Sequence, residues 1–544
     1  MSLFASEKLL FTPTTSKNSN PIPLIFAFPN QYTVGITSLG YQLIWANFAT
    51  REDVLVSRLF TDIEDNLPRH PEIVGFSFSW ELDYVNIFNL LEQLQIPIYA
   101  KDRTENHPLI FGGGPVLTAN PEPFAEFFDV ILLGDGENLI DNFIDSYQEI
   151  RNGNREEKLI HLAQTGGIYC PSLYAVEYEN IAGKIKSIKP INEQIPATVE
   201  KQTYRGNVLS ASTVVTEKAA WENIYMVEVV RSCPEMCRFC LASYLTLPFR
   251  TASLEASLIP AIERGLKVTN RLGLLGASVT QHPEFSELLD YIMQPKYDDV
   301  RLSIASVRTN TVTEKLAQTL TKRDTKSITI AIESGSPKIR QIINKKLENE
   351  EIIEAAVNAQ SGGLRGIKFY GMVGLPQEDN SDLDATVEMM RQVKKASPRL
   401  KTTLGCSTFV PKAHTPFQWF GVNKQSKKRL QYLQKKLAKA GVDFRPESYN
   451  WSVIQGLLSR GDRRLSKLLE LTRIYGDTLG SYKRAFKELK GQLPDLEYYV
   501  HDDWEIGQVL PWSHLKTALA DETLVKHLQM SFPQQEKIFT GEGV

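Results

Sequence analysis

The residues with the clearest chemistry in this 544-residue chain are three cysteines on one short segment. Cys233, Cys237 and Cys240 lie in the run Arg-Ser-Cys-Pro-Glu-Met-Cys-Arg-Phe-Cys. Three thiolates this close together can each ligate one iron of a [4Fe–4S] cube and leave the fourth iron without a protein ligand. An iron that is open in this way can bind a small molecule, so the spacing predicts a site of chemistry and not only a store for an electron.

The cysteine segment follows an apolar stretch, residues 224–230, that has the pattern of a buried strand. The thiolates are therefore expected on a loop at the carboxyl end of a strand, where the active sites of α/β barrels lie. The alternative is a zinc knuckle or three unrelated thiols. Zinc prefers four ligands, and the remaining cysteines, Cys170 and Cys406, lie far apart and form no second pair.

The pattern Cys-x3-Cys-x2-Cys, with the aromatic residue Phe239 before the last cysteine, resembles the signature of radical S-adenosylmethionine (SAM) enzymes. The resemblance implies that SAM binds the open iron through its amino and carboxylate groups. An electron from the reduced cluster then cleaves SAM to a 5′-deoxyadenosyl radical, which abstracts a hydrogen atom from the substrate. It also implies an electron donor of the flavodoxin or ferredoxin type.

The composition indicates a soluble protein of a reducing compartment. Five cysteines are too few for a secreted fold built on disulfides, and the first residues lack the features of a signal peptide. No uncharged apolar stretch reaches the length of a membrane span. We therefore expect a cytoplasmic protein without a membrane-spanning part, which also suits an oxygen-sensitive cluster.

The expected fold class is α/β, in four parts. Residues 1–150 alternate short apolar strands with amphipathic helices, which is typical of a Rossmann-like, doubly wound sheet. Residues 151–222 form a polar linker subdomain, and residues 421–544 a basic, mainly helical region. Residues 223–420 repeat strand–helix units and, by the resemblance, form a partial (β/α)6 barrel of the TIM type. Its six strand candidates are residues 225–230, 271–275, 301–305, 327–332, 366–373 and 402–410.

Two glycine-rich segments follow strands in the first part: Phe-Gly-Gly-Gly-Pro at 111–115 and Leu-Gly-Asp-Gly-Glu at 133–137. Neither matches a phosphate-binding loop. Together they resemble the cobalamin-binding domain that precedes many radical SAM barrels, where such loops cradle the corrin. The family's Asp-x-His-x-x-Gly motif is replaced by Asn-Gln-Tyr-Thr-Val-Gly at 30–35, and no histidine precedes His70. This part is expected to bind cobalamin without a histidine ligand, to bind another ligand, or to serve as a scaffold.

Further residues stand where radical SAM barrels contact SAM. Glu333, in Ile-Glu-Ser-Gly-Ser after the fourth strand, resembles the glutamate that hydrogen-bonds the SAM ribose. Gly276 occupies the place of the loop that binds the SAM amino group, although Gly-Ala-Ser replaces the usual Gly-Glu. Lys338, Arg340 and Lys345 can each offer a cation to the SAM carboxylate. Arg340 is preferred because its guanidinium fork suits a carboxylate, and a structural ion pair is the alternative.

Two further segments bear on the substrate. Residues 409–419 are expected where the barrel opens, and there His414 is either an acid–base group or a hydrogen-bonding loop residue. Residues 421–490 contain 17 Lys or Arg against 6 Asp or Glu. This excess predicts either a partner such as RNA or another anionic molecule, or a solvated helical face.

The resemblance implies an enzyme that cleaves SAM reductively and functionalises an unactivated carbon. The reaction is methylation if the first domain holds a methyl-carrying corrin. Otherwise it is hydrogen abstraction followed by rearrangement, oxidation or modification of RNA or protein. The chain most resembles a group of bacterial radical SAM proteins without the cobalamin histidine, whose reaction is uncharacterised. The alternative from another class is a non-catalytic iron–sulfur redox sensor or RNA-binding protein.

Overall fold

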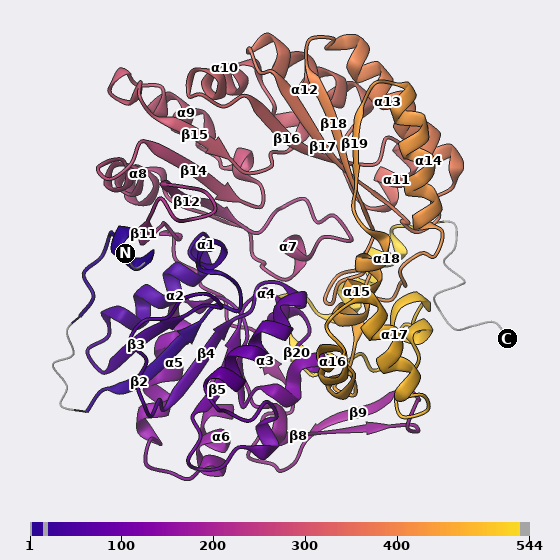
Figure 1. Cartoon of the computed structure of the whole chain (residues 1–544). Helices are drawn as coiled ribbons and strands as arrows, with labels where there is room; N and C mark the ends of the chain where they lie inside the picture. The colour runs from indigo at the N-terminus through magenta and orange to yellow at the C-terminus, as the bar shows by residue number, and fades with distance from the viewer. Residues whose placement is uncertain (1–2, 15–19, 534–544) are drawn as a thin grey trace.

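The computed structural model describes residues 3–14 and 20–533, and it confirms the expected α/β architecture. Figure 1 shows two halves, with the first sheet at the bottom of the view and the barrel at the top. Residues 534–544, the end of the expected C-terminal region, lie outside the described part. No helix within the described ranges is both long enough and apolar enough to cross a membrane.

The first domain is built on a sheet of six strands: β2 (Ile22–Ala27), β3 (Val54–Leu59), β4 (Ile73–Ser77), β5 (Leu109–Gly113), β6 (Val130–Leu132) and β7 (Ile168–Tyr169). Their spatial order is β3-β2-β4-β5-β6-β7, and all neighbours are parallel except β6 and β7. The first five strands have the order of a flavodoxin-like, doubly wound sheet. In such sheets a ligand binds outside the carboxyl ends, where the winding reverses, here between β2 and β4.

Helices cover both faces of this sheet, so its central strands are apolar on both sides. Consecutive residues Leu24, Ile25 and Phe26 of β2 are all buried. The main helices are α2 (Leu39–Thr50), α3 (Tyr84–Gln93), α5 (Gly136–Glu149) and α6 (Arg155–Ala163), and α2 packs beside α5. The sheet continues past the expected boundary at residue 150, because β7 follows α6 and pairs with β6.

The second domain contains the six expected parallel strands: β12 (Ile224–Arg231), β14 (Arg271–Gly276), β15 (Arg301–Ile304), β16 (Ser327–Glu333), β17 (Gly366–Val373) and β18 (Lys401–Thr408). They form two four-stranded sheets, which also include the short strands β13 (Arg250–Thr251) and β19 (Asp443–Pro446). A parallel bridge between Val307 and Ile330 joins the two sheets. The outer layer consists of α8 (Ile259–Leu266), α9 (Phe285–Ile292), α10 (Glu314–Lys322), α12 (Asn349–Ser361), α13 (Asn380–Ala396) and α14 (Ser426–Lys439), so the partial barrel is confirmed.

The segment expected as a linker connects both halves with the C-terminal region. It contains a hairpin of β8 (Tyr174–Tyr178) and β9 (Ile185–Pro190), and β10 (Val199–Glu200) pairs with β20 (Leu515–Lys516). Gln202 then bridges to Gly134 of the first domain. The segment is therefore part of the packing between domains.

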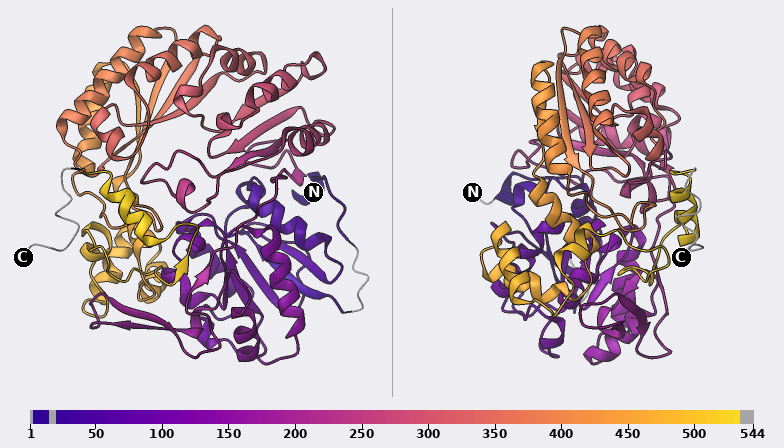
Figure 2. Two further views of the ribbon diagram at one scale, coloured as in Figure 1. Left: turned by 180° about the vertical axis from the view of Figure 1, so that it is seen from behind. Right: turned by 90° about the vertical axis from the view of Figure 1, so that its right-hand side faces the viewer.

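The C-terminal region divides between the two halves. Helix α14 and strand β19 complete the barrel beyond residue 420, because β19 pairs with β18. Helices α15 (Tyr449–Arg460), α16 (Leu465–Ile474) and α17 (Leu479–Glu488) pack on the first domain, as both views of Figure 2 show. Their leucines belong to the same hydrophobic core as the first sheet, whereas the barrel has a second core.

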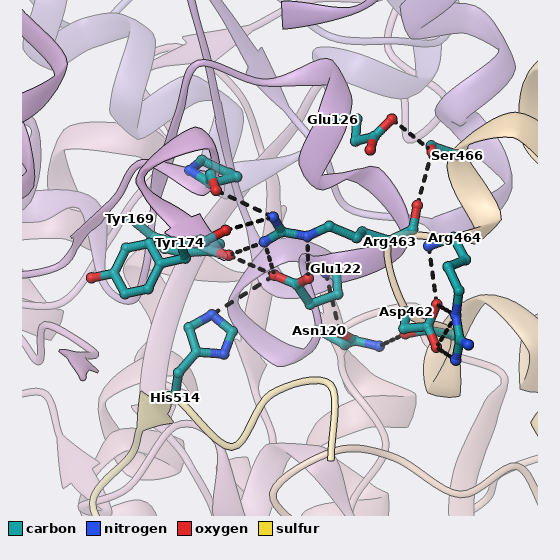
Figure 3. A network of polar contacts seen from close by, with 12 residues as sticks. Asn120, Glu122, Glu126, Tyr169, Tyr174, Asp462, Arg463, Arg464, Ser466 and His514 are labelled. Carbon is teal, nitrogen blue, oxygen red and sulfur yellow. Dashed lines mark hydrogen bonds and ion pairs between the residues drawn. The ribbon is translucent and has the colours of Figure 1, made fainter. Parts of the chain in front are cut away.

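A buried polar network fastens these helices to the first domain (Figure 3). Arg463 donates to Glu122 at 2.9 Å (Nε–Oε2), and the Tyr169 hydroxyl donates to the same carboxylate at 2.6 Å. The Nε2 atom of His514 lies 3.7 Å from Glu122. Asn120 donates to the Ser459 and Gly461 carbonyl oxygens, which fixes the end of α15.

Candidate active site

The three cysteines lie on the loop between β12 and α7 (Leu241–Tyr244), at the carboxyl end of the first barrel strand as expected. Ser232 and Met236 adopt left-handed backbone angles (φ of 70° and 54°), which non-glycine residues rarely do. The Nδ2 atom of Asn344 donates to the Glu235 and Met236 carbonyl oxygens at 3.1 and 2.9 Å. The loop conformation is therefore held from the opposite side of the barrel.

The surrounding protein shifts the pKa of two of the three cysteine thiols. Burial raises the pKa of Cys237 to about 12 and also raises the pKa of Cys240. Such thiols become thiolates when a metal cation replaces the proton. Other groups act against this rise in pKa. The charge of Lys345 lowers the pKa of Cys237, and hydrogen bonds from Ser243 lower that of Cys240.

The three cysteines succeed one another along a single loop. In the part of the chain that the structure describes, no three His, Cys, Asp or Glu side chains converge as the ligands of one metal ion. That the three thiolates hold a cube stays a prediction from their spacing.

The structure brings Glu333 and Lys345 to the cysteine loop. Glu333 ends β16 with a left-handed φ of 64°, at an irregularity in the pairing of β16 with β17. Its carboxylate lies 3.3 Å from the Nζ atom of Lys345, and both side chains are almost buried. Both groups influence the pKa of Cys237 electrostatically. The contact between Glu333 and the SAM ribose stays a prediction, with its location next to the cluster loop in its favour.

Arg340 is turned toward the protein backbone and not toward the cysteine loop. Its guanidinium donates to the Ser334 carbonyl oxygen at 2.9 Å and its Nε to that of Leu347 at 2.8 Å. Arg340 therefore fixes the segment that follows Glu333. The preference for Arg340 as the SAM cation is not supported by this geometry, whereas Lys345 lies beside Glu333 and acts electrostatically on Cys237.

Gly276 and Phe239 lie close to the cysteine segment for different reasons. Gly276 has a φ of 150°, and a Cβ atom there would lie 2.6 Å from the carbonyl oxygen of Val230. Packing of β14 on β12 thus requires glycine, whatever the ligand. Phe239 is partly buried and packs on the core of the first domain, so it anchors the loop between Cys237 and Cys240.

A cavity of about 460 Å³ separates the first domain from the barrel. It lies at the carboxyl ends of β2, β4, β5 and β6, which includes the reversal point of the sheet. Ser232, which precedes Cys233, and Gly276 line it from the barrel side. Its volume is within the range of small-molecule sites, and its walls are mainly apolar. No histidine is among the residues that line it.

The glycine-rich segments are explained mainly by neighbouring protein. A Cβ atom at Gly114 would lie 2.5 Å from the Phe78 carbonyl oxygen, and one at Gly134 would collide with Gln202. A Cβ atom at Gly40, in contrast, would meet nothing within 4 Å, and this residue lines the cavity at the start of α2. Two glycines that line the cavity therefore leave room for a ligand: Gly40, which the sequence pattern did not single out, and Gly113 of the first glycine-rich segment.

The acidic residues of the second glycine segment are held by the barrel. Arg231 of β12 lies 2.7 Å from Glu137 and 3.4 Å from Asp135. Arg250 contacts Asp135 at 2.5 Å. These ion pairs lock the loop of the first sheet to the strand that carries the cysteine segment.

His414 does not fit an acid–base role near neutral pH. Its side chain is buried and its Nε2 atom has no hydrogen-bond partner. Burial lowers the pKa of His414 to about 3, so the imidazole is neutral. The interpretation as a structural loop residue is the one that the geometry favours.

Comparison with known proteins agrees with this site. Residues 59–171 match the model of the N-terminal part of radical SAM proteins, and residues 227–390 match the radical SAM superfamily. The chain is a radical SAM protein, and the cofactors of this class are a [4Fe–4S] cluster and SAM. Its enzymatic class is thereby defined, whereas its substrate is not.

Relatives extend over most of the chain. An uncharacterised protein of Methanocaldococcus jannaschii is 28% identical over 82% of this chain and 90% of its own length. An uncharacterised methyltransferase of Pyrococcus horikoshii is 23% identical over 61% of this chain and 67% of its own length. The fold is similar to that of the radical SAM methyltransferase TsrM from Kitasatospora setae, solved with cobalamin and a [4Fe–4S] cluster bound. That likeness has a TM-score of 0.51 at 13% identity and covers 73% of this chain and 74% of the other.

We expect Glu333→Gln to weaken SAM binding by about 10–100-fold while the cluster assembles normally. A carboxylate accepts charge-assisted hydrogen bonds from hydroxyls, and an amide does so less strongly. Lys345→Met should have a similar effect, since it removes the cation beside Glu333. Equilibrium dialysis of SAM and iron analysis measure the two quantities. Glu314→Gln, on the exposed face of α10, is the control, and equal SAM binding by Glu333→Gln would contradict the assignment.

Proposed function

We propose that this protein is a corrin-dependent radical SAM methyltransferase that acts on an unactivated carbon. The observation that carries the proposal is the cavity at the carboxyl edge of the first sheet, which extends to the cysteine loop. A ligand there would contact the first domain through Gly40 and the barrel through Ser232 and Gly276. The relation to a methyltransferase of Pyrococcus horikoshii, and the likeness in fold to TsrM with its cobalamin, support it.

The residues of the chain have distinct tasks in this proposal. Cys233, Cys237 and Cys240 hold the cluster, and Glu333 with Lys345 holds SAM beside it. The cluster with SAM supplies a carbon-centred radical, and a corrin supplies a methyl group. The apolar walls of the cavity exclude water from both. Reductive cleavage also requires an electron donor, for which a flavodoxin or ferredoxin stays the prediction.

The second candidate is a radical SAM enzyme that abstracts hydrogen without a corrin. The observation in its favour is that Gly114 and Gly134 are in contact with protein, and that Asp135 and Glu137 are paired with arginines. These loops need no ligand to explain them. A non-catalytic redox sensor is disfavoured because it has no use for the Glu333–Lys345 pair beside the cluster loop. Binding of RNA or another anionic molecule by the basic residues of 421–490 stays a prediction.

The two candidate functions differ in whether the protein binds a corrin. The full chain is purified anaerobically, its cluster is reconstituted, and cobalamin is added before gel filtration and absorption spectroscopy. Reductant-dependent formation of 5′-deoxyadenosine is measured on the same sample. Retained corrin together with 5′-deoxyadenosine supports the methyltransferase. Formation of 5′-deoxyadenosine without retained corrin supports the second candidate and overturns the first.

We expect Gly40→Trp to abolish corrin retention and to leave cluster content unchanged. The position has room for a side chain, and a large indole there would occupy the cavity beside the start of α2. Gly480→Trp is the matched control, because Gly480 is likewise the second residue of its helix, α17, and lies away from the cavity. Corrin retention by Gly40→Trp would show that the corrin lies elsewhere.

A further inference from the structure

A second and smaller cavity, of about 210 Å³, lies where the first domain, the barrel and the C-terminal helices meet. Its walls come from the segment after β4, from α4 (Pro115–Ala119), from the loop after β18 and from α15. Ser79 and Pro115 line this cavity and the larger one as well, so the two adjoin. Leu241, directly after the cluster ligand Cys240, forms part of its wall.

An ion pair lies in the wall of this cavity, which is lined by both apolar and polar residues. The Nζ atom of Lys412 lies 2.6 Å from Oε1 of Glu81 and 2.8 Å from the Ser459 hydroxyl. The two charged side chains are only 19% and 12% exposed. Lys412 lowers the pKa of Glu81 against the effect of burial, so the Glu81 carboxylate is charged. Trp80, which is 48% exposed, adds an aromatic surface at the same cavity.

A charged pair of this kind stabilises a fold poorly. Removing two charges from water is unfavourable, and apolar residues of similar volume often serve a protein interior equally well. The pair and the Ser459 hydroxyl join the segment after β4 to α15, and both charged groups also line the cavity, where a ligand can contact them. A ligand with one charge would satisfy one partner and leave the other charge buried without a counter-ion. A ligand with both an ammonium and a carboxylate group satisfies Glu81 and Lys412 at the same time.

We propose that this cavity binds the substrate, and that the substrate is a small zwitterion, an α-amino acid or a close analogue with an apolar side chain. The volume is below the range for drug-sized ligands, which agrees with a molecule of this size. The inference rests on the proposed function, because the ligand would lie beside the larger cavity and next to Leu241. The substrate's carboxylate would lie at Lys412, its ammonium at Glu81, and its side chain against Trp80.

The test is equilibrium binding and not turnover, so it is independent of methyl transfer. The full chain with its reconstituted cluster and SAM is titrated with the common L-amino acids by calorimetry. The best of them is then compared with the amine that lacks its carboxylate and with the acid that lacks its ammonium. We expect the amino acid to bind at least about tenfold more tightly than either analogue.

Variants of Glu81 and Lys412 distinguish a role in binding the ligand from a role in holding the fold together. Lys412→Met and Glu81→Gln should each weaken binding of the amino acid by about tenfold or more. Lys184→Met is the matched control, because Lys184 also pairs with a glutamate, Glu505, at 2.6 Å but away from the cavity. Circular dichroism establishes that each variant is folded, and Lys412→Arg, which keeps the charge, should restore part of the affinity.

The inference is overturned if no L-amino acid binds, or if either variant binds as the unaltered protein does. In that case corrin retention and 5′-deoxyadenosine formation still report on the proposed function. Binding of an amino acid by a protein that retains no corrin would support the cavity assignment as a substrate site and overturn the methyltransferase proposal alone.

Discussion

Replacing Cys237 by serine is expected to abolish the cluster and with it the cleavage of SAM. The thiol of Cys237 is almost buried, on a loop that Asn344 holds in place, and its loss leaves one iron of the cube without a thiolate. Changes to groups around metal ligands already cost about 10–100-fold in affinity or activity, and loss of a ligand should exceed this range. We expect iron to fall from about four per chain to well below one. Formation of 5′-deoxyadenosine should fall to the level of a sample without protein.

The control for this experiment is Cys170→Ala. Cys170 is fully buried directly after β7, the edge strand of the first sheet, and burial keeps its thiol protonated by raising the pKa. Its loss should leave the iron content and the cleavage of SAM unchanged, with a modest loss of stability. A Cys237→Ser protein that still binds about four irons and forms 5′-deoxyadenosine would show that the cluster is held elsewhere.

The alternation of strands and helices predicted the doubly wound first sheet, and together with the resemblance to radical SAM enzymes it predicted the partial barrel. Strands such as residues 366–373 are bounded by glycines and carry apolar residues at regular spacing, so their limits follow from the sequence and agree with β17 (Gly366–Val373). Boundaries between domains were less predictable. Strand β7 joins the first sheet, and β19 joins the barrel, through pairings between segments that are distant or separated by a helix. Such pairings depend on tertiary packing, which local patterns do not contain.

Only those residues of the candidate site could be predicted whose side-chain type indicates a particular ligand. The cysteine spacing indicated a cluster from residue types alone, and the resemblance pointed to Glu333, whose contact with SAM stays a prediction. Arg340 was preferred over Lys345 on the shape of its guanidinium, but hydrogen bonds to the Ser334 and Leu347 carbonyl oxygens engage that group. Lys412 and Glu81 are more than 300 positions apart, so no sequence spacing could indicate their contact.

Glu122 and Arg463 form a buried pair that no spacing could predict either, and it controls how the C-terminal helices attach. Arg463→Met is expected to destabilise this attachment by about 3–5 kcal/mol, because it leaves the Glu122 carboxylate buried without its cation. His514 does not compensate at neutral pH, since burial lowers its pKa to about 4. The control is Arg473, which also lies on α16 and pairs with Glu92 of α3 near the surface. Arg473→Met should lower the free energy of unfolding by less than about 1 kcal/mol.

The pH dependence gives this prediction its second test. In the unaltered protein Arg463 lowers the pKa of Glu122, so the stabilising contribution is present above about pH 4.3, the ordinary value of a glutamate, and is lost as the pH falls below it. Without Arg463, Glu122 together with His514 binds a proton on folding. The loss of stability caused by Arg463→Met should therefore grow as the pH rises from 5 to 8. Urea denaturation and hydrogen exchange of α16 at both pH values measure it. If this loss of stability is independent of pH, Arg463 acts through packing and not through its charge. The same conclusion follows if adding Glu122→Gln to Arg463→Met does not reduce the loss.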